Sequence, residues 1–388
     1  MSAEPFQIQT EQRVLDDLRE RLRHVRWPSQ LGPGDWTTGM PIHALEPIVT
    51  YWKESFDWRK SEKELNRFHH FLCSVDGFPI HFIHERGIGP KPLPIILSLG
   101  WPDCFLRYRK IILALSDPGR YGGDPADAFD VVVPSLPGFG FSRSREGKSL
   151  NNLQIADLWV KLMAEHLDYQ TFAAGGGDVG SGVSRYIAER HPEKIVGLHV
   201  TDIGIIRAIL ASPDNSLNAA ELTYKGEATQ WMLQEGGYMT IQSTKPQTLS
   251  YALTDSPVGL AAWILEKFHS WSDPHGKLQT RDSWDELLTN ITLYWITGTI
   301  GSSAHVYYNN SRGLTPLVKN NVPTGLALFP ADILLPPEDW ARKNFAIQRL
   351  THMPRGGHFT AWEEPELFVE DIREFFKPLR SRFDTVPS

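Results

Sequence analysis

The sequence has little cysteine and no long apolar run. Only two of its 388 residues are cysteines, Cys73 and Cys104, which argues against a disulfide framework and against a four-thiolate metal site. The most apolar stretches, such as residues 94–97 and 131–133, fall far short of the roughly 20 residues that a membrane-spanning helix needs. The N-terminus has neither a basic start nor an apolar core segment. We therefore expect no secretory signal and a cytoplasmic location.

The sequence also lacks a strong excess of charge of either sign. Lys and Arg number 39 and Asp and Glu number 46, which gives a net charge of −7. This balance argues against nucleic acid or an anionic membrane as a partner. With 41% hydrophobic and 22% charged residues, the composition is that of an ordinary globular protein. The length fits one large catalytic domain with a sizeable insertion.

Hydrophobic spacing divides the chain into four segments. Residues 1–68 carry amphipathic helix signals without strand signals, which indicates a helical segment that wraps around the rest. Residues 69–204 begin with a hairpin around Asp76-Gly77 and continue with apolar strands that alternate with helices, among them one near residues 105–115 and one over residues 179–190. Residues 205–320 are helix-rich and aromatic, as expected of a lid. Strands and helices alternate again in residues 321–388, which end in a helix over residues 365–376. Apolar strands separated by helices predict an α/β protein with a mostly parallel sheet covered on both faces.

Asp178 lies in a glycine-rich turn between a predicted strand and a predicted helix. Gly176 stands two positions before it and Gly180 two positions after it, which is the nucleophile-elbow pattern with aspartate in place of serine. A carboxylate that attacks a saturated carbon makes an ester whose carbonyl belongs to the protein, so water can hydrolyse it. A serine would leave an unreactive ether. Two other interpretations stay open, a phosphate-binding turn and a simple helix N-cap.

His358 and Asp332 follow Asp178 in the chain order that α/β-hydrolases use for nucleophile, acid and histidine. His358 follows two glycines just before the last predicted helix. Asp332 comes directly after a predicted strand, where its carboxylate can orient the imidazole. The alternatives are His352 for the base and Glu338 or Asp339 for the acid.

Two backbone N–H groups are expected to form an oxyanion hole for the ester carbonyl. One belongs to Val179, directly after the nucleophile. The other is assigned to Trp101, in the loop that follows the strand ending near Leu99.

These motifs resemble the microsomal and juvenile-hormone branch of the epoxide hydrolases over nearly the whole chain. The matching segments include residues 100–102, 134–142, 237–246, 255–262 and 354–358. The resemblance implies an α/β-hydrolase fold with a helical lid, no cofactor or metal, and conversion of an apolar epoxide to a vicinal diol. It also implies two lid tyrosines that protonate the epoxide oxygen, which are Tyr238 and Tyr307 by motif position. The expected partners are the epoxide and water, with a homodimer as the candidate assembly and no membrane anchor.

Other lid tyrosines, namely Tyr224, Tyr251 and Tyr308, are expected to belong to the core. Two positions depart from the family pattern in ways that affect the site. Leu99 stands where the family has histidine, which removes a polar prop beneath the oxyanion loop, and Val179 stands where the family has tryptophan, which reshapes the pocket floor. In addition, Asp103 replaces the usual glycine and is expected to add a carboxylate near the pocket mouth. We expect these changes to alter rate or substrate range.

The sequence leaves two competing functions open. Haloalkane dehalogenases share the aspartate nucleophile, but they hold the halide with side-chain N–H donors that Val179 cannot supply. A pseudo-hydrolase that binds a ligand without turning it over is the non-catalytic alternative, and the intact set of Asp178, Asp332 and His358 argues against it.

Overall fold

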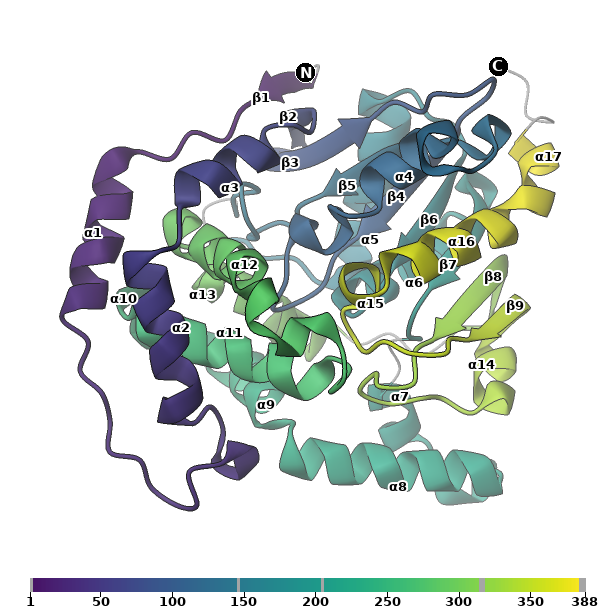
Figure 1. The fold of residues 1–388 in the computed structure, drawn as a ribbon. Coiled ribbons are helices and arrows are strands. Elements are labelled where there is room, and N and C mark those ends of the chain that lie inside the picture. Colours follow the sequence, from purple (N-terminus) through teal and green to yellow (C-terminus); the bar gives the residue numbers. More distant parts are fainter. Residues whose placement is uncertain (1–2, 145–146, 204–205, 314–317, 384–388) are drawn as a thin grey trace.

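The computed structural model describes residues 3–144, 147–203, 206–313 and 318–383. Within these residues, a nine-stranded sheet forms the centre, in the order β1-β2-β3-β5-β4-β6-β7-β8-β9 (Figure 1). The first three strands pair antiparallel, and β3 is also antiparallel to β5. All pairs from β5 to β9 are parallel. The strands are β1 (Glu4–Phe6), β2 (His70–Val75), β3 (Phe78–Glu85), β4 (Leu93–Ser98), β5 (Phe129–Pro134), β6 (Phe172–Gly176), β7 (Ile195–Val200), β8 (Asn320–Leu328) and β9 (Phe345–His352).

The predicted hairpin is present as β2 and β3. Asp76 and Gly77 at its turn have φ values of 49° and 79°, the left-handed conformation that a two-residue hairpin turn requires. Strands β4, β5 and β7 are buried along their whole length, as expected of a parallel sheet with both faces covered.

One strand in the N-terminal segment contradicts the expectation that this segment has none. Strand β1 pairs with β2, with Phe6 opposite His70. The Phe6 ring also packs against the rings of His81 and Phe141. Contact with these side chains therefore holds a three-residue strand that is too short to show an alternating pattern.

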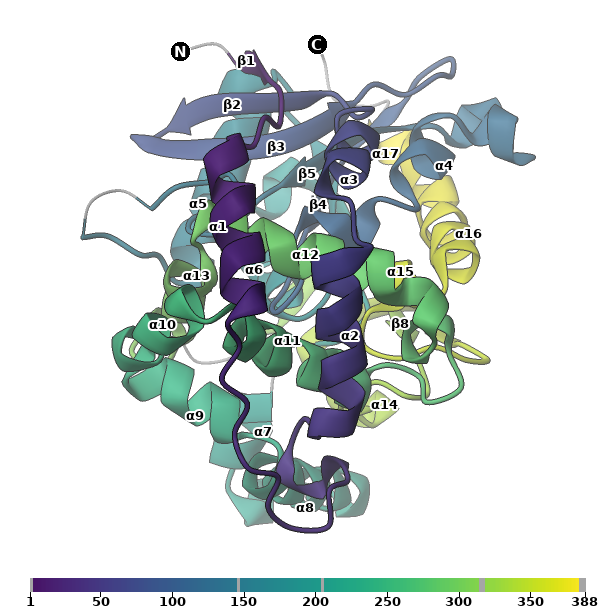
Figure 2. The ribbon, with the colours of Figure 1, turned by 60° about the vertical axis from the view of Figure 1, so that its left-hand side comes forward.

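Helices cover both faces of the sheet. Figure 2 shows α4 (Ile112–Ser116) and α16 (Pro365–Phe376) on one side, and α5 (Asn152–Lys161) and α6 (Val179–Arg190) on the other. Helices α6 and α16 have the predicted bounds. The helix expected near residues 105–115 is broken into a 3-10 turn at Phe105–Tyr108 and the short α4.

Among the described residues between β7 and β8, seven α-helices build the predicted helical region. They are α7 (Ile206–Ala211), α8 (Ala219–Gln234), α9 (Gly237–Thr244), α10 (Pro246–Asp255), α11 (Pro257–Trp271), α12 (Trp284–Thr297) and α13 (Ile300–Asn310). Local signals set several of their ends. Asn218 and Glu221 form a capping box at the start of α8, and Ser256 caps α11, which begins with proline. Residues 204–205, where the lid is predicted to begin, lie outside the described residues.

The N-terminal segment packs on the lid helices. Its helices α1 (Gln12–Arg23), α2 (Ile42–Glu54) and α3 (Trp58–Leu65) lie against α11 and α12 in both ribbon views (Figures 1 and 2). The Trp52 indole N–H donates to the buried Thr292 hydroxyl at 3.0 Å, and Arg21 donates to the Asp255 carboxylate at 2.8 Å. This segment therefore holds the lid from outside.

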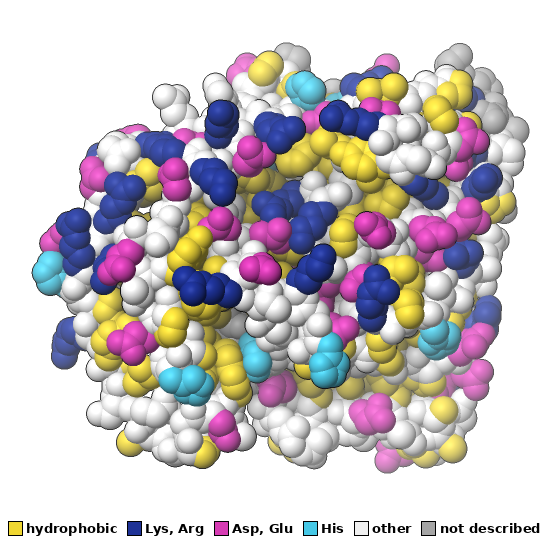
Figure 3. Space-filling model, in the orientation of Figure 1, with side chains coloured by type: hydrophobic (Ala, Val, Ile, Leu, Met, Phe, Trp, Pro, Cys, Tyr) yellow, Lys and Arg dark blue, Asp and Glu magenta, His cyan; other side chains and the backbone are white. Residues whose placement is uncertain are grey.

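Charges of both signs are mixed on the surface. On the face in Figure 3, Lys and Arg side chains alternate with Asp and Glu side chains instead of forming a patch of one sign. Across the part of the chain that the structure describes, each helix is too short or too polar to span a bilayer.

Candidate active site

Asp178 occupies a strained turn between β6 and α6. Its φ of 57° and ψ of −129° are unusual for a residue with a side chain and occur where the surrounding structure enforces them. The enforcement comes from close packing, because a Cβ at Gly180 would overlap the Ser98 carbonyl and a Cβ at Gly176 would lie 2.6 Å from Gly180. The Asp178 side chain makes no capping hydrogen bond to α6, so it is not a simple N-cap.

The two predicted backbone donors lie beside the Asp178 carboxylate. The Trp101 N–H donates to Oδ1 at 2.9 Å, and the neighbouring Val179 N–H, after His358 and Arg107, is one of the groups that lower the pKa of Asp178. Gly100 permits this approach, because a Cβ at that position would lie 2.5 Å from the Cβ of Asp178. The loop after β4 thus brings an N–H to one carboxylate oxygen and leaves the other, Oδ2, available.

His358 and Asp332 reach Asp178 from the ends of β9 and β8. Because the carboxyl ends of parallel strands meet at one edge of the sheet, residues distant in sequence converge there. The Nδ1 of His358 lies 2.7 Å from Oδ1 of Asp332, and its Nε2 lies 3.4 Å from Oδ2 of Asp178. The two loops are also joined by a bridge between Ala331 and Gly357.

Burial and charge set the protonation of this pair. Burial alone would lower the pKa of His358, but the negative charge of Asp332 and the contact with Asp178 outweigh it and raise the pKa to about 10. Burial would raise the pKa of Asp178, yet His358 and the charge of Arg107 lower it below its usual value. At neutral pH the site therefore holds an imidazolium beside a carboxylate.

Tyr238 and Tyr307, the two lid tyrosines predicted to act in catalysis, line the same cavity as Asp178. The Tyr238 and Tyr307 side chains are buried, and their ring centroids lie 5.9 Å apart at 79°. The Trp101 ring stacks on Tyr238 at 5.2 Å and meets Tyr307 edge-on at 5.9 Å. Burial and then the charge of Asp178 raise the pKa of Tyr238 well above its usual value, while the neighbouring Tyr307 opposes the rise. Burial and then the nearby Tyr238 and Asp178 raise the pKa of Tyr307 as well. Both phenols therefore keep their protons at neutral pH.

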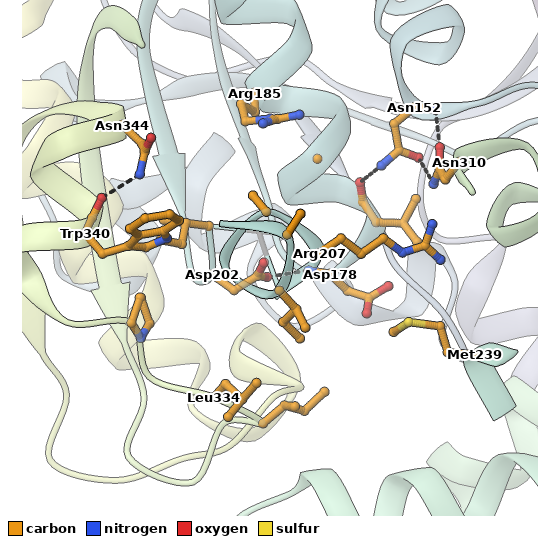
Figure 4. A pocket seen from close by; sticks show the side chains of 18 of the residues that line it. Asn152, Asp178, Arg185, Asp202, Arg207, Met239, Asn310, Leu334, Trp340 and Asn344 are labelled. Atoms are coloured by element: carbon orange, nitrogen blue, oxygen red, sulfur yellow. Dashed lines mark hydrogen bonds between the residues drawn. The ribbon is translucent and has the colours of Figure 1, made fainter. Parts of the chain in front are cut away.

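A cavity of about 820 Å³ joins these groups. Figure 4 shows Asp178 among the side chains that line it. Its wall includes Asp178, Val179, Tyr238, Tyr307, Asp332 and His358, and it continues along apolar side chains of α7, α8 and the loop after β8. Five of the residues predicted to act in catalysis thus share one cavity. Val179 borders this cavity, as expected of a residue in the pocket floor.

Asp202 is a carboxylate that sequence reasoning missed. It follows β7 and lies next to Asp178 in the cavity wall (Figure 4). Its Oδ2 accepts the Asp178 backbone N–H at 2.6 Å and the Ser181 hydroxyl at 2.9 Å. Burial and then the charge of Asp332 raise its pKa to about 6. Asp202 therefore fixes the backbone of the elbow.

Asp103 does not lie near the pocket mouth, contrary to prediction. Its side chain is fully buried and forms an ion pair with Arg107, one helical turn further along the chain. Arg107 in turn donates to the carbonyl of His358 at 3.1 Å. The turn after Trp101 points the Asp103 carboxylate into the protein, where it compensates a buried guanidinium. Leu99 is fully buried as well.

The alternative candidates for base and acid lie outside the cavity, and the other three lid tyrosines differ in burial. His352 is exposed at the end of β9, and Glu338 and Asp339 are exposed at the start of α14 (Glu338–Asn344), so none of the three lines the cavity. Tyr224 is buried in the cavity wall, whereas Tyr308 is half-buried under Arg312. The core prediction is wrong for Tyr251, which is 72% exposed on α10.

Comparisons with known proteins point to one family over nearly the whole chain. The family described as "Epoxide hydrolase N terminus" matches residues 3–108, and "alpha/beta hydrolase fold" matches residues 94–233. Epoxide hydrolase 1 of Sus scrofa is 38% identical over 402 residues, covering 96% of this chain and 88% of that protein. The crystal structure of juvenile hormone epoxide hydrolase from Bombyx mori superposes with a TM-score of 0.83 at 28% identity, covering 98% and 94% of the two chains. The Aspergillus niger epoxide hydrolase gives 0.86 at 28% identity, covering 98% and 97%.

Proposed function

The chain belongs to the epoxide hydrolase family of α/β-hydrolases, and on this premise we propose that it opens an apolar epoxide through a covalent ester on Asp178. In the first step, Oδ2 of Asp178 attacks an oxirane carbon and the carbon–oxygen bond of the ring breaks. The departing oxygen takes a proton from the pair of Tyr238 and Tyr307. An alkoxide is strongly basic, so a phenol with a pKa near or above 10 is an adequate acid.

In the second step, water hydrolyses the ester. His358 takes a proton from water, which attacks Cγ of Asp178, and the N–H groups of Trp101 and Val179 stabilise the oxyanion. Collapse of the tetrahedral intermediate breaks the bond between Cγ and Oδ2, and the departing diol oxygen takes a proton from the His358 imidazolium. The new carboxylic acid on Asp178 then returns a proton to His358. Asp332 holds the imidazole through Nδ1, 2.7 Å from its carboxylate, and stabilises the imidazolium.

Esterification itself prepares His358 for this role. Before the reaction, the imidazole is protonated because two carboxylates raise its pKa to about 10. Ester formation removes the charge of Asp178, so the pKa of His358 falls and the ring gives up a proton. That proton replaces the one lost by the tyrosine. The final collapse restores the carboxylate and the imidazolium, so the cycle consumes one epoxide and one water and yields one diol.

One observation carries the proposal. The Trp101 N–H holds Oδ1 of Asp178 at 2.9 Å, while Oδ2 faces His358 at 3.4 Å. The carboxylate is therefore divided into an oxygen suited to become the ester carbonyl and an oxygen free to attack. A carboxylate that served only to orient water would not need an oxyanion hole of its own.

A single-turnover experiment in oxygen-18 water tests this mechanism. With protein in excess over styrene oxide, we expect the first diol to contain no label and Asp178 to gain one labelled oxygen, detected by peptide mass. Direct attack of water on the epoxide would instead label the diol in the first turnover and leave Asp178 unlabelled. That result would refute the ester mechanism.

Two variants extend the test. H358Q should trap the ester as a mass increase on Asp178, and D178N should form neither ester nor diol. A haloalkane supplied in place of the epoxide should release no halide. Halide release without diol formation would favour a dehalogenase, and binding without turnover of either compound would favour a pseudo-hydrolase.

A further inference from the structure

Glu363 holds the loop that carries His358. It is the last residue of α15 (Thr360–Glu363), and its carboxylate accepts three backbone hydrogen bonds. Oε1 accepts the Phe359 N–H at 3.0 Å. Oε2 accepts the Gly357 N–H at 3.2 Å and the Asp273 N–H at 2.7 Å. Two of the three donors are therefore the immediate neighbours of His358, one on each side.

The third donor belongs to the lid. Asp273 follows α11, and its side chain accepts the Gly356 N–H at 3.0 Å. The backbone N–H of His358 donates to the carbonyl of Trp271, the last residue of α11, at 2.8 Å. The histidine loop is thus hydrogen-bonded to the end of a lid helix, with Glu363 bridging the two.

Glu363 suits this position because a carboxylate has two oxygens that can each accept several hydrogen bonds. Among the described residues no lysine or arginine forms an ion pair with it, and backbone N–H groups surround its oxygens. Burial raises its pKa to about 7, although the three N–H groups oppose the rise. A glutamine would accept with one oxygen only and would turn its NH₂ group toward a backbone N–H.

The end of α11, to which Glu363 ties the histidine loop, also contacts Tyr238, the proposed acid. The Trp271 ring packs 5.2 Å from Tyr238 and 5.4 Å from His358. A shift of Trp271 would therefore move the base relative to the lid tyrosine. Glu363 is the carboxylate that ties this lid end to the loop of the base.

We propose that Glu363 is a positioning residue that fixes His358 to the lid and is required for hydrolysis of the ester but not for its formation. The inference rests on the two-step reaction proposed above. In the first step Asp178 forms the new bond, and His358 gives up its proton only after the ester has formed. In the second step the imidazole must lie within reach of the attacking water, where a displacement of about 1 Å costs roughly a hundredfold in rate.

The variant E363Q tests this assignment, with E364Q as the matched control. Glu364 is adjacent in sequence, but its partly buried carboxylate pairs with the exposed Arg355 at 2.9 Å. Rapid-quench single turnovers with styrene oxide, followed by intact mass, give separate rates of ester formation and ester decay. For E363Q we expect decay to slow by roughly tenfold to a hundredfold and formation to change by less than about threefold. E364Q should match the unmutated protein in both rates.

Steady-state kinetics give a second readout. If only ester decay is slowed, kcat and KM fall together and kcat/KM is preserved, while the ester accumulates during turnover. General loss of structure would lower kcat/KM instead. Equal slowing of both steps, or no slowing of either, would overturn the assignment.

A second variant keeps the proposal testable if E363Q does not fold. Thermal unfolding shows whether E363Q is folded, and if it is not, D273N replaces it as the test variant. D273N weakens the hydrogen bond that the lid residue Asp273 accepts from the Gly356 N–H. We expect slower ester decay in D273N, and an unchanged decay rate would overturn the assignment. If the unmutated protein itself forms no ester on Asp178, the failure lies in the proposed function and not in the role of Glu363.

Discussion

Three carboxylates meet at the cavity, and their surroundings give them different properties. Asp178 accepts N–H groups and faces His358, which lowers its pKa. Asp202 is buried beside two other carboxylates, which raises its pKa to about 6. Because its pKa is the higher of the two, Asp202 gives up its negative charge before Asp178 does as the pH falls. Asp178, the proposed nucleophile, thus keeps its charge although it lies among like charges.

Removing Asp202 should impair the first step of the reaction. In D202A the Asp178 N–H loses its 2.6 Å acceptor, and a buried N–H without a partner costs about 1–3 kcal/mol. We expect ester formation to slow by about tenfold and the Tm to fall, measured by rapid quench and by calorimetry. D214A is the surface control, because the Asp214 side chain is 76% exposed and pairs with Lys225 at 2.8 Å. Unchanged ester formation in D202A would contradict the role assigned to Asp202.

The raised pKa of His358 predicts how stability depends on pH. A base whose pKa is higher in the folded protein than in the unfolded chain stabilises the fold fully below the unfolded value of about 6.5. This stabilisation is lost as the pH rises toward the folded value of about 10. We expect the Tm of the unmutated protein to fall more steeply between pH 7 and 10 than that of H358Q. Parallel curves for the two proteins would contradict a raised pKa.

Some of these residues could be predicted from the sequence and others could not. Asp178, Asp332 and His358 follow from the chain order and from the turns that hold them. Asp202 and Glu363 carry no such signal, because each is defined by backbone N–H groups from distant elements. Asp103 was misplaced for a related reason, since spacing does not tell which way a side chain points after a loop.

At the scale of elements, the nucleophile turn depends on how closely α6 approaches β4. A Cβ at Gly180 would meet the Ser98 carbonyl, which belongs to the backbone and cannot move away cheaply. The glycines therefore let helix and strand touch, and this contact maintains the strain at Asp178.

The variant G180A should lose both stability and activity. We expect a fall in unfolding free energy of about 1–3 kcal/mol, as for other overpacked sites, together with a large loss of ester formation. G226A is the matched control, because Gly226 lies inside α8 with open space where a Cβ would be added. That change should stabilise the protein by about 0.5–1 kcal/mol. A G180A protein as stable and active as the unmutated one would show that the close approach is unnecessary.

The elements that the sequence predicted best are long and periodic. Helices α6 and α16 have the expected bounds, and the hairpin of β2 and β3 turns at the expected Asp76 and Gly77, because turn residues and apolar spacing agree there. The region of residues 105–115 shows helical spacing yet folds as two short turns, because Arg107 is drawn inward to Asp103 and to the histidine loop. Tertiary contacts overrode the local preference.

For the whole molecule, the N-terminal segment and the lid stabilise each other. Trp52 and Thr292 join α2 to α12 through a buried hydrogen bond of 3.0 Å. Because a buried partner left unsatisfied costs about 1–3 kcal/mol, W52F should lower the Tm and increase hydrogen exchange in α12.

A double-mutant cycle with T292V isolates this contact. We expect W52F and T292V to be non-additive, with a coupling energy of about 0.5–3 kcal/mol from denaturant unfolding. The double mutant should then be more stable than the sum of the single effects implies. Additive effects would show that the hydrogen bond does not join the two segments energetically.

The same contact has a consequence for the time course of synthesis. Trp52 and Thr292 are 240 positions apart, and a ribosome adds roughly 5–20 residues per second. The N-terminal helices therefore leave the ribosome about 10–50 s before the surface that covers their apolar side chains exists. During that interval Trp52 and its neighbours have no native partner on the lid. A nascent chain stalled before α12 should for this reason bind chaperones through its first 68 residues, and a chain stalled after α13 should release them.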